Sequence, residues 1–343
     1  MHELLNVLYV QRQGAVLHLE NDTVKIELED EGPKRIPLLR LSGIVVFGRV
    51  SVTPFLIQRC AEDGRSLVWL DQHGRFKARL EGATRGNVLL RRAQHLALSD
   101  PQHALRIGRQ IVAGKIQNSR QILLRASREA AGGEESGPLG EAAERLAEIL
   151  ETLRVARDMD AVRGAEGDAA RTYFGVFGYM VRSEREAMAP AGRTRRPPRD
   201  RANALLSFLY TLLRFECASA LEGVGLDPQV GYLHALRPGR PALALDLMEE
   251  LRPVMADRFA LTLVNRRQLK PEHFEEKPGG AVLLNEEGRR ALLVAYQQRK
   301  EDVVTHRVLN QKVPLGLVPH LQARLLARHL RGDLKEYPPF VYR

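Results

Sequence analysis

"LALSDPQHALRIGRQIVAGKIQNSRQILLRAS", Leu96 to Ser127, is the segment in which the chain changes its periodicity. Its apolar residues recur at spacings of three and four, which is typical of a helix with one apolar face. Ser99 and Asp100 come directly before Pro101, a combination that marks a helix start. The helical period begins at about Gly86 and continues, so we expect the second part of the chain to be built from α-helices.

The residues before this segment alternate with the period of a β-strand. In "VKIELE", residues 24–29, apolar and charged side chains follow one another, so one face of the strand is apolar and the other is wet. One helix interrupts the strands: Thr53 is its expected N-cap, Pro54 its first residue and Gly64 its stop. The first part of the chain is therefore expected to be β-rich with one helix.

Together these patterns predict an α+β fold with two domains. We expect a β-rich, β-sandwich-like N-terminal domain over residues 1–90 and a larger all-α C-terminal domain over residues 91–343. A chain of 343 residues exceeds the usual span of one hydrophobic core, which fits this division. Lys277 to Gly280 could close one small hairpin within the helical part. Further helices are expected to begin at Glu141, Asp168, Ala202, Pro241, Glu286 and Pro319.

The charge of the chain favours a polyanionic partner. Lys and Arg number 52 against 42 Asp and Glu, which gives a net charge of +10. The segment "RTRRPPRDR", Arg193 to Arg201, concentrates five arginines, and an arginine can bind a phosphate through two N–H groups. A basic enzyme without such a partner, in which this segment is only a solvated loop, is the alternative.

Several classes of protein find no support in the sequence. Cys60 and Cys217 have no CxxC spacing, so neither a disulfide framework nor a thiolate metal site is predicted, and a reducing cytoplasm fits. The apolar run from Asn203 to Leu213 is shorter than the roughly 20 residues that a bilayer requires, so we expect a buried core helix and no membrane partner. "GRQIVAGKI" has the wrong spacing for a P-loop, and the segment is interpreted as part of a helix.

Candidate catalytic residues gather in "GYLHALRPGRPALALDLMEELRP", Gly231 to Pro253. A helix that begins at Pro241 places Asp246, Glu249 and Glu250 on one face, one turn apart. A solvated acidic face is the common explanation of such a pattern. His234 precedes the helix in a short loop constrained by Gly and Pro, so its imidazole could return over the first two turns.

Carboxylates and one imidazole are a ligand set that suits Mg²⁺ or Mn²⁺. Arg237, Arg240 and Arg252 flank the same stretch. A hard cation surrounded by arginines is expected where a phosphodiester is cut or joined, because arginine neutralises the non-bridging oxygens. The spacing leaves the third ligand open among Glu166, Glu216 and Glu222.

Four blocks in this order resemble the CRISPR-associated adaptation integrases, metal-dependent DNA endonucleases that insert new spacers into the CRISPR array in antiviral defence. The blocks are "DQHGRFKARLEG", "RGAEGDAARTYF", "RRPPRDRANALLSFLYTLL" and "GYLHALRPGRPALALDLMEELRP", and the resemblance covers nearly the whole chain. It implies that Glu166, His234 and Glu249 bind Mg²⁺ or Mn²⁺. Some branches of the family carry Asp where this chain has Glu249. Asp246 matches a further acid of the site, in a supporting or occasional ligand role.

The resemblance also implies a reaction and partners. The 3′-hydroxyl of the spacer DNA attacks a phosphodiester at the repeat boundary, and branched DNA is cut by the same site. The family forms homodimers through its β domains, and a small ferredoxin-like protein bridges two dimers. The expected DNA contacts are Arg163, Arg193, Arg195, Arg196, Arg199, Arg237, Arg240 and Arg252. The alternatives are a non-catalytic basic scaffold for nucleic acid and a hydrolase of small phosphate esters, and the charge of +10 disfavours the latter.

Overall fold

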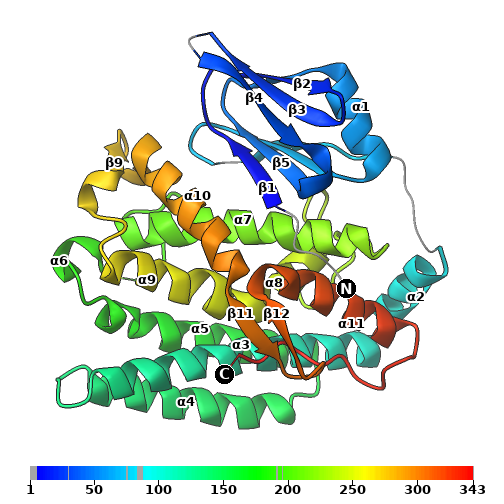
Figure 1. Cartoon of the computed structure of the whole chain (residues 1–343). Helices are drawn as coiled ribbons and strands as arrows, with labels where there is room; N and C mark the ends of the chain where they lie inside the picture. Colours follow the sequence, from blue (N-terminus) through cyan, green and yellow to red (C-terminus); the bar gives the residue numbers. More distant parts are fainter. Residues whose placement is uncertain are drawn as a thin grey trace. The chain divides into compact units, whose positions relative to one another are not determined.

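The computed structural model describes residues 6–29, 31–74, 76–82, 88–190, 192–194 and 196–342 (Figure 1). Contacts along the backbone divide the chain into two units. The first comprises Met1–Arg85 with Asn285–Glu301, and the second comprises Gly86–Leu284 with Asp302–Arg343. The α+β class is confirmed, with a strand-rich first part followed by a mostly helical one. Residues 285–301, which the sequence placed in the helical domain, belong instead to the first unit.

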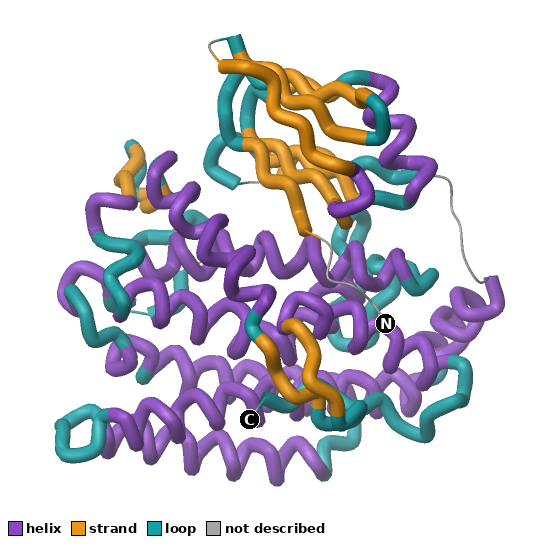
Figure 2. Tube along the Cα trace, viewed as in Figure 1, coloured by secondary structure: helices purple, strands orange, loops and turns teal. Residues whose placement is uncertain are grey.

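Two four-stranded sheets form the first unit (Figure 2). In one sheet the first three strands run parallel and the last is antiparallel to its neighbour. Its order is β1 (Asn6–Val10), β5 (Leu41–Phe47), β7 (Ser66–Leu70) and β8 (Phe76–Arg79). The order of the other sheet is β4 (Glu31–Pro37), β3 (Thr23–Leu28), β2 (Val16–Glu20) and β6 (Ser51–Val52).

Both sheets and one helix contribute to a single apolar core in this unit. Leu17 and Val24 come from one sheet, Ile44 from the other, and Leu56 from α1 (Pro54–Asp63). The predicted bounds of α1 are confirmed, because it follows Thr53 as N-cap and ends at Gly64, whose φ of 68° is the left-handed conformation that favours glycine. The apolar faces of the alternating strands therefore pack on one shared core.

The helix α10 (Glu286–Glu301) completes the first unit. The side-chain amide of Gln297 donates a hydrogen bond of 2.9 Å to the carbonyl oxygen of Val7 in β1. A contact between residues so distant in sequence leaves no local signal, which is why the helical pattern alone assigned this segment to the wrong domain.

Helices dominate the second unit. They are α2 (Val88–Ser99), α3 (Pro101–Glu129), α4 (Ser136–Arg154), α5 (Met159–Gly175), α6 (Arg185–Met188), α7 (Arg201–Gly223), α8 (Ala242–Arg252), α9 (Arg258–Asn265) and α11 (Val318–Leu330). A π-helical turn, Pro253–Asp257, connects α8 to α9. Short 3₁₀ turns lie at Leu38–Arg40, Phe177–Met180, Pro271–His273 and Leu315–Leu317.

The predicted start of α3 is confirmed, whereas that of α5 is wrong. The carboxylate of Asp100 accepts a hydrogen bond of 2.9 Å from the backbone N–H of Gln102 and caps α3. α5 starts at Met159 rather than Asp168, because Asp158 caps it in the same way through the N–H of Ala161 at 2.8 Å. The helix continues through two glycines, since its Val162, Ala165 and Ala169 are buried.

Two hairpins make the second unit less than wholly helical. β9 (Phe274–Lys277) and β10 (Ala281–Leu284) form the hairpin that the sequence predicts. β11 (Val303–His306) and β12 (Gln311–Pro314) form a second, unpredicted one. The turn before β12 contains no glycine, and Asn310 adopts the left-handed conformation there with a φ of 49°.

Two glycines let α3 pack closely in the second unit. A Cβ atom at Gly108 would lie 2.9 Å from Cε of Met159 in α5, and one at Gly114 would lie 3.1 Å from Cβ of Glu250 in α8. Such distances are tighter than Cβ contacts normally are, so a larger residue at Gly114 would press on α8, whereas one at Gly108 would require the end of the Met159 side chain to move. Gly108 and Gly114, whose spacing does not match a P-loop, therefore serve helix packing.

α7 is the one described helix that is long and apolar enough to cross a membrane by length and composition. Of its most apolar window, 61% is buried inside the protein, as in the core helix that the sequence predicts.

Candidate active site

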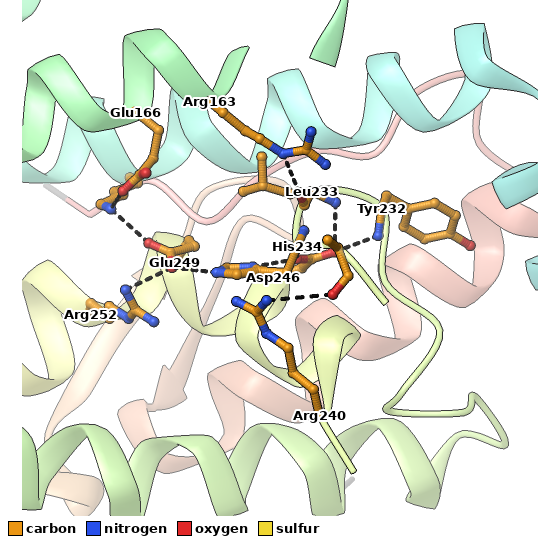
Figure 3. Close-up of polar contacts among 11 residues, drawn as sticks. Arg163, Glu166, Tyr232, Leu233, His234, Arg240, Asp246, Glu249 and Arg252 are labelled. Carbon is orange, nitrogen blue, oxygen red and sulfur yellow. Dashed lines mark hydrogen bonds and ion pairs between the residues drawn. The ribbon is translucent and has the colours of Figure 1, made fainter. Parts of the chain in front are cut away.

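Asp246 in α8 holds the loop that precedes this helix (Figure 3). Its carboxylate accepts hydrogen bonds from the backbone N–H groups of Tyr232, Leu233 and His234, at 2.6, 3.0 and 2.9 Å. Gly231 makes the approach possible, because a Cβ atom there would lie 2.6 Å from the backbone of Ala242. The loop thus returns over the first turns of the helix, as the Gly and Pro residues around it predict.

The same carboxylate orients the imidazole of His234. Nδ1 of the ring lies 2.7 Å from Oδ1 of Asp246, and Nε2 faces Oε1 of Glu249 at 3.7 Å. Because the oxygens of a carboxylate can only accept, Nδ1 of the imidazole donates to Asp246, and Nε2 is left on the side of Glu249. Nε2 therefore points toward the carboxylate with which it is expected to share a metal ion.

Glu249 is buried between two cations, with a side-chain exposure of 2%. Its carboxylate lies 2.7 Å from Nη1 of Arg252 and 2.8 Å from Nζ of Lys115 in α3. Burial acts to raise the pKa of Glu249, but Arg252, Lys115 and His234 together hold that pKa at about 2. The group is a carboxylate at any physiological pH.

Glu166 in α5 reaches the same place from the opposite side (Figure 3). Its Oε1 forms an ion pair with Nζ of Lys115, and its side chain is 30% exposed. One ammonium group therefore joins the carboxylates of Glu166 and Glu249, which come from different helices. The two carboxylates and the imidazole named from the sequence do converge.

The donors at this place fit a hard divalent cation. Two carboxylates and an imidazole are the groups that Mg²⁺ and Mn²⁺ accept, and here both carboxylates reach Lys115 while Nε2 of His234 faces Glu249. Within the described ranges, no three His, Cys, Asp or Glu side chains are already spaced around one ion. The ammonium of Lys115 supplies the positive charge between the carboxylates instead.

A solvated acidic face, the alternative explanation of the α8 pattern, is excluded by burial. Asp246 and Glu250 have exposures of 0%, and Glu249 has 2%. Glu250 points away from Glu249, and its carboxylate accepts hydrogen bonds from the Tyr337 hydroxyl at 2.6 Å and the Phe340 N–H at 3.1 Å. Burial raises the pKa of Glu250 to about 8, and these hydrogen bonds oppose the rise. Glu249 thus belongs to the candidate site, whereas the neighbouring Glu250 holds the C-terminal segment.

A buried polar cluster fixes Arg252 from behind. Its guanidinium carbon lies 5.1 Å from the ring centroid of Tyr210, a cation–π distance. The Tyr210 hydroxyl donates a hydrogen bond of 2.6 Å to Asp257, which the π-helical turn after α8 carries inward. Burial raises the pKa of Asp257 to about 6, while the Tyr210 hydrogen bond and nearby arginines act to lower it. The guanidinium is therefore held toward Glu249 rather than toward solvent.

The arginines around the loop differ in how strongly they are held. Nε of Arg163 donates a hydrogen bond of 3.0 Å to the carbonyl oxygen of Leu233, and Nη1 of Arg240 lies 3.5 Å from the carbonyl oxygen of Ala235 (Figure 3). Arg237 is exposed. Arg163 and Arg240 thus lie against the loop that carries His234, and Arg237 belongs to that loop.

The arginines of the segment 193–201 are distributed differently. Arg193 donates to the side-chain oxygen of Asn203 at 2.6 Å and lies over the ring of Tyr210, so it is partly buried inside the unit. Arg196 and Arg199 are exposed, and Arg199 donates to the carbonyl oxygen of Gly279 at 2.5 Å. Arg195 lies outside the described residues.

Residues 8–298 match the sequence pattern of the family described as "CRISPR associated protein Cas1". The chain belongs to the Cas1 family. "CRISPR-associated endonuclease Cas1 1" of Moorella thermoacetica is 58% identical over 343 residues, which cover 100% of both chains. "CRISPR-associated endonuclease Cas1 2" of Rhodospirillum rubrum is 50% identical, again over 100% of both. The solved structure of a Cas1 protein from Thermotoga maritima has 25% identity and a TM-score of 0.81, covering 98% of this chain and 99% of that one.

Lys115 is the residue of this Cas1-family site that sequence reasoning missed. It lies 51 residues before Glu166 and inside a long regular helix, where a lysine usually faces solvent. The one available signal was its position after Gly114, which packs against α8 and so turns the next residue toward the core. Three elements, α3, α5 and α8, therefore build the candidate site around this side chain.

Proposed function

We propose that this chain is a metal-dependent DNA endonuclease and integrase that inserts short DNA fragments as new spacers into a CRISPR array. The attacking group is the 3′-hydroxyl of the fragment, and the bond attacked is a phosphodiester at the repeat boundary. One observation carries the proposal: Glu166, Glu249 and the Asp246-oriented His234 converge in a chain of the Cas1 family. The names of its relatives, which are endonucleases, support the same reaction class.

In this proposal Glu166, Glu249 and Nε2 of His234 hold Mg²⁺ or Mn²⁺. The bound ion supplies Lewis acidity at the phosphoryl oxygen and favours the deprotonated form of the attacking hydroxyl. Asp246 accepts a hydrogen bond from Nδ1 of His234, so Nε2 is the ring atom that is directed to the metal. Arg252 and Arg163 place positive charge where negative charge develops on the phosphate.

The two units have separate roles in this proposal. The β-rich first unit forms the homodimer, and the helical second unit carries the catalytic site. Double-stranded and branched DNA are the substrates, and a small ferredoxin-like protein bridges two dimers. We expect the chain to act in the cytoplasm, where its DNA substrate lies.

The direct test is cleavage of branched DNA by the purified chain in Mn²⁺. Glu166→Ala, His234→Ala and Glu249→Ala are each expected to reduce the rate by about 100-fold or more. Asp168→Ala, which removes an exposed acid of the same helix α5, serves as the matched control and should leave the rate unchanged. Full activity of His234→Ala would rule out the proposed metal nuclease.

Integration itself needs a second assay, on supercoiled repeat DNA with the small partner present. Wild type is expected to join fragments to the repeat boundaries, and Glu166→Ala is not. If both proteins bind DNA and neither cuts nor joins it, the chain is instead the non-catalytic scaffold.

A further inference from the structure

The side chain of Lys115 occupies the middle of the candidate metal site. Its Nζ atom is 2.8 Å from Oε2 of Glu249 and forms an ion pair with Oε1 of Glu166. The lysine side chain is only 11% exposed, so water screens these ion pairs weakly. Both carboxylates assigned to the metal are therefore engaged by a cation that belongs to the chain.

A divalent ion and this ammonium need the same oxygen atoms. Glu249 directs Oε2 to Lys115 and Oε1 to Arg252, so neither oxygen lacks a positive neighbour. A positive charge that remained between the carboxylates would also repel an incoming cation. Because Arg252 is held by Tyr210 and bonds only Oε1, Lys115 is the group that has to move.

We infer that Lys115 is a positioning residue that acts as a tethered competing cation: it keeps Glu166 and Glu249 together without metal and is displaced from them by Mg²⁺ or Mn²⁺. The inference rests on the proposed metal site. It adds a consequence, namely that the affinity for metal is set by competition with the chain's own ammonium group. It also explains how two carboxylates can share a largely buried site before an ion is bound.

The experiment measures Mn²⁺ binding to the chelator-stripped full-length protein, with free Mn²⁺ followed by electron paramagnetic resonance. Lys115→Met removes the ammonium and keeps an apolar stem, and it should bind Mn²⁺ at least about tenfold more tightly than wild type. Lys115→Arg keeps the charge, so its affinity should equal that of wild type or fall below it. Lys25→Met is the matched control, because Lys25 also bridges two glutamates, at 3.4 Å from Glu20 and 2.7 Å from Glu27, in the other unit.

Thermal unfolding gives a readout that does not depend on catalysis. In chelator, Lys115→Met should unfold at a lower temperature than wild type, since Glu166 and Glu249 lose their shared partner. Added Mn²⁺ should raise its unfolding temperature by more than it raises that of wild type. In the wild type, Mg²⁺ should shift the ¹⁵N resonance of the Lys115 ammonium, which keeps the test independent of how the variants fold.

The outcomes separate the inference from the proposed function. Mn²⁺ binding that depends on Glu249, as shown by its loss in Glu249→Gln, but is no tighter in Lys115→Met overturns the inference alone. Mn²⁺ binding that is unaffected by Glu249→Gln, in the wild type and in Lys115→Met, overturns the metal site and the inference together.

Discussion

The carboxylate of Asp246 holds His234 twice, through Nδ1 of the ring at 2.7 Å and through the backbone N–H at 2.9 Å. One buried side chain thus fixes both the position and the orientation of the imidazole. Neither oxygen of Asp246 is spare, because Tyr232 and Leu233 also donate to it. Both oxygens of the acid are therefore committed to positioning His234 and its loop.

Asp246→Asn is expected to lower both stability and activity. The amide replaces an acceptor oxygen with an N–H group that faces backbone N–H donors, which should cost about 1–3 kcal/mol of the unfolding free energy. Cleavage of branched DNA should fall by about 10- to 100-fold, as when the partner of a metal-binding histidine is lost. Urea unfolding and initial cleavage rates measure the two effects. Asp168→Asn, at an exposed ion pair of α5, should change neither.

Gly231→Ala should disrupt the loop that carries His234. Its Cβ atom would lie 2.6 Å from the backbone carbon of Ala242 and 2.8 Å from Oδ2 of Asp246, so the loop has to move away from α8. We expect a loss of about 1–3 kcal/mol in unfolding free energy together with weaker Mn²⁺ binding. Gly164→Ala in α5 is the control, because a Cβ there meets no atom within 4 Å. It should stabilise the helix by up to about 1 kcal/mol, and destabilisation by it would contradict this account.

The metal-free protein should lose stability in acid through Glu249. The folded pKa of about 2 lies below the ordinary value of 4.5, so the unfolded chain binds the proton more readily between these values. The stabilisation, on the order of 3 kcal/mol, is complete above pH 4.5 and disappears as the pH falls toward 2. Urea unfolding in chelator should therefore show a gap between wild type and Glu249→Gln that narrows below pH 4.5. A gap that stays constant down to pH 3 would refute the assignment.

Arg237→Ala should weaken DNA binding without affecting stability. This arginine is exposed in the loop that carries His234, and a phosphate contact there would release about one counterion. The slope of log affinity against log salt should therefore fall in magnitude by about one, as measured by fluorescence anisotropy with branched DNA. Arg145→Ala removes an exposed arginine from α4 and is the control. Equal slopes for wild type and Arg237→Ala would exclude this contact.

Local signals in the sequence predicted the parts of the fold that depend on local chemistry. Thr53, Pro54 and Gly64 bounded α1 because an N-cap, a fixed φ and a left-handed glycine act within a few residues. The loop over α8 followed in the same way from its Gly and Pro residues. The start of α5 was misplaced because its glycines resemble a break, while buried apolar contacts keep the helix continuous.

Features that depend on distant contacts were not predictable from spacing. The convergence of Glu166 with Glu249 was implied by the family resemblance and not by any periodicity. The role of Lys115 and the unit to which α10 belongs were missed, although α10 itself was predicted. The ion pairs of Lys115 and the hydrogen bond of Gln297 to β1 join segments that are far apart in the chain. Arg193 is partly buried against Tyr210, a contact that charge density does not indicate, and its DNA contact stays a prediction.

The charges at the centre of the site cancel. Glu166 and Glu249 carry two negative charges, and Lys115 and Arg252 carry two positive ones. A zinc finger needs its ion in order to fold, but a neutral cluster of this kind needs none. The helical unit should therefore be able to fold first and take up metal last, so protein purified in chelator should regain its activity on simple addition of Mn²⁺, without refolding.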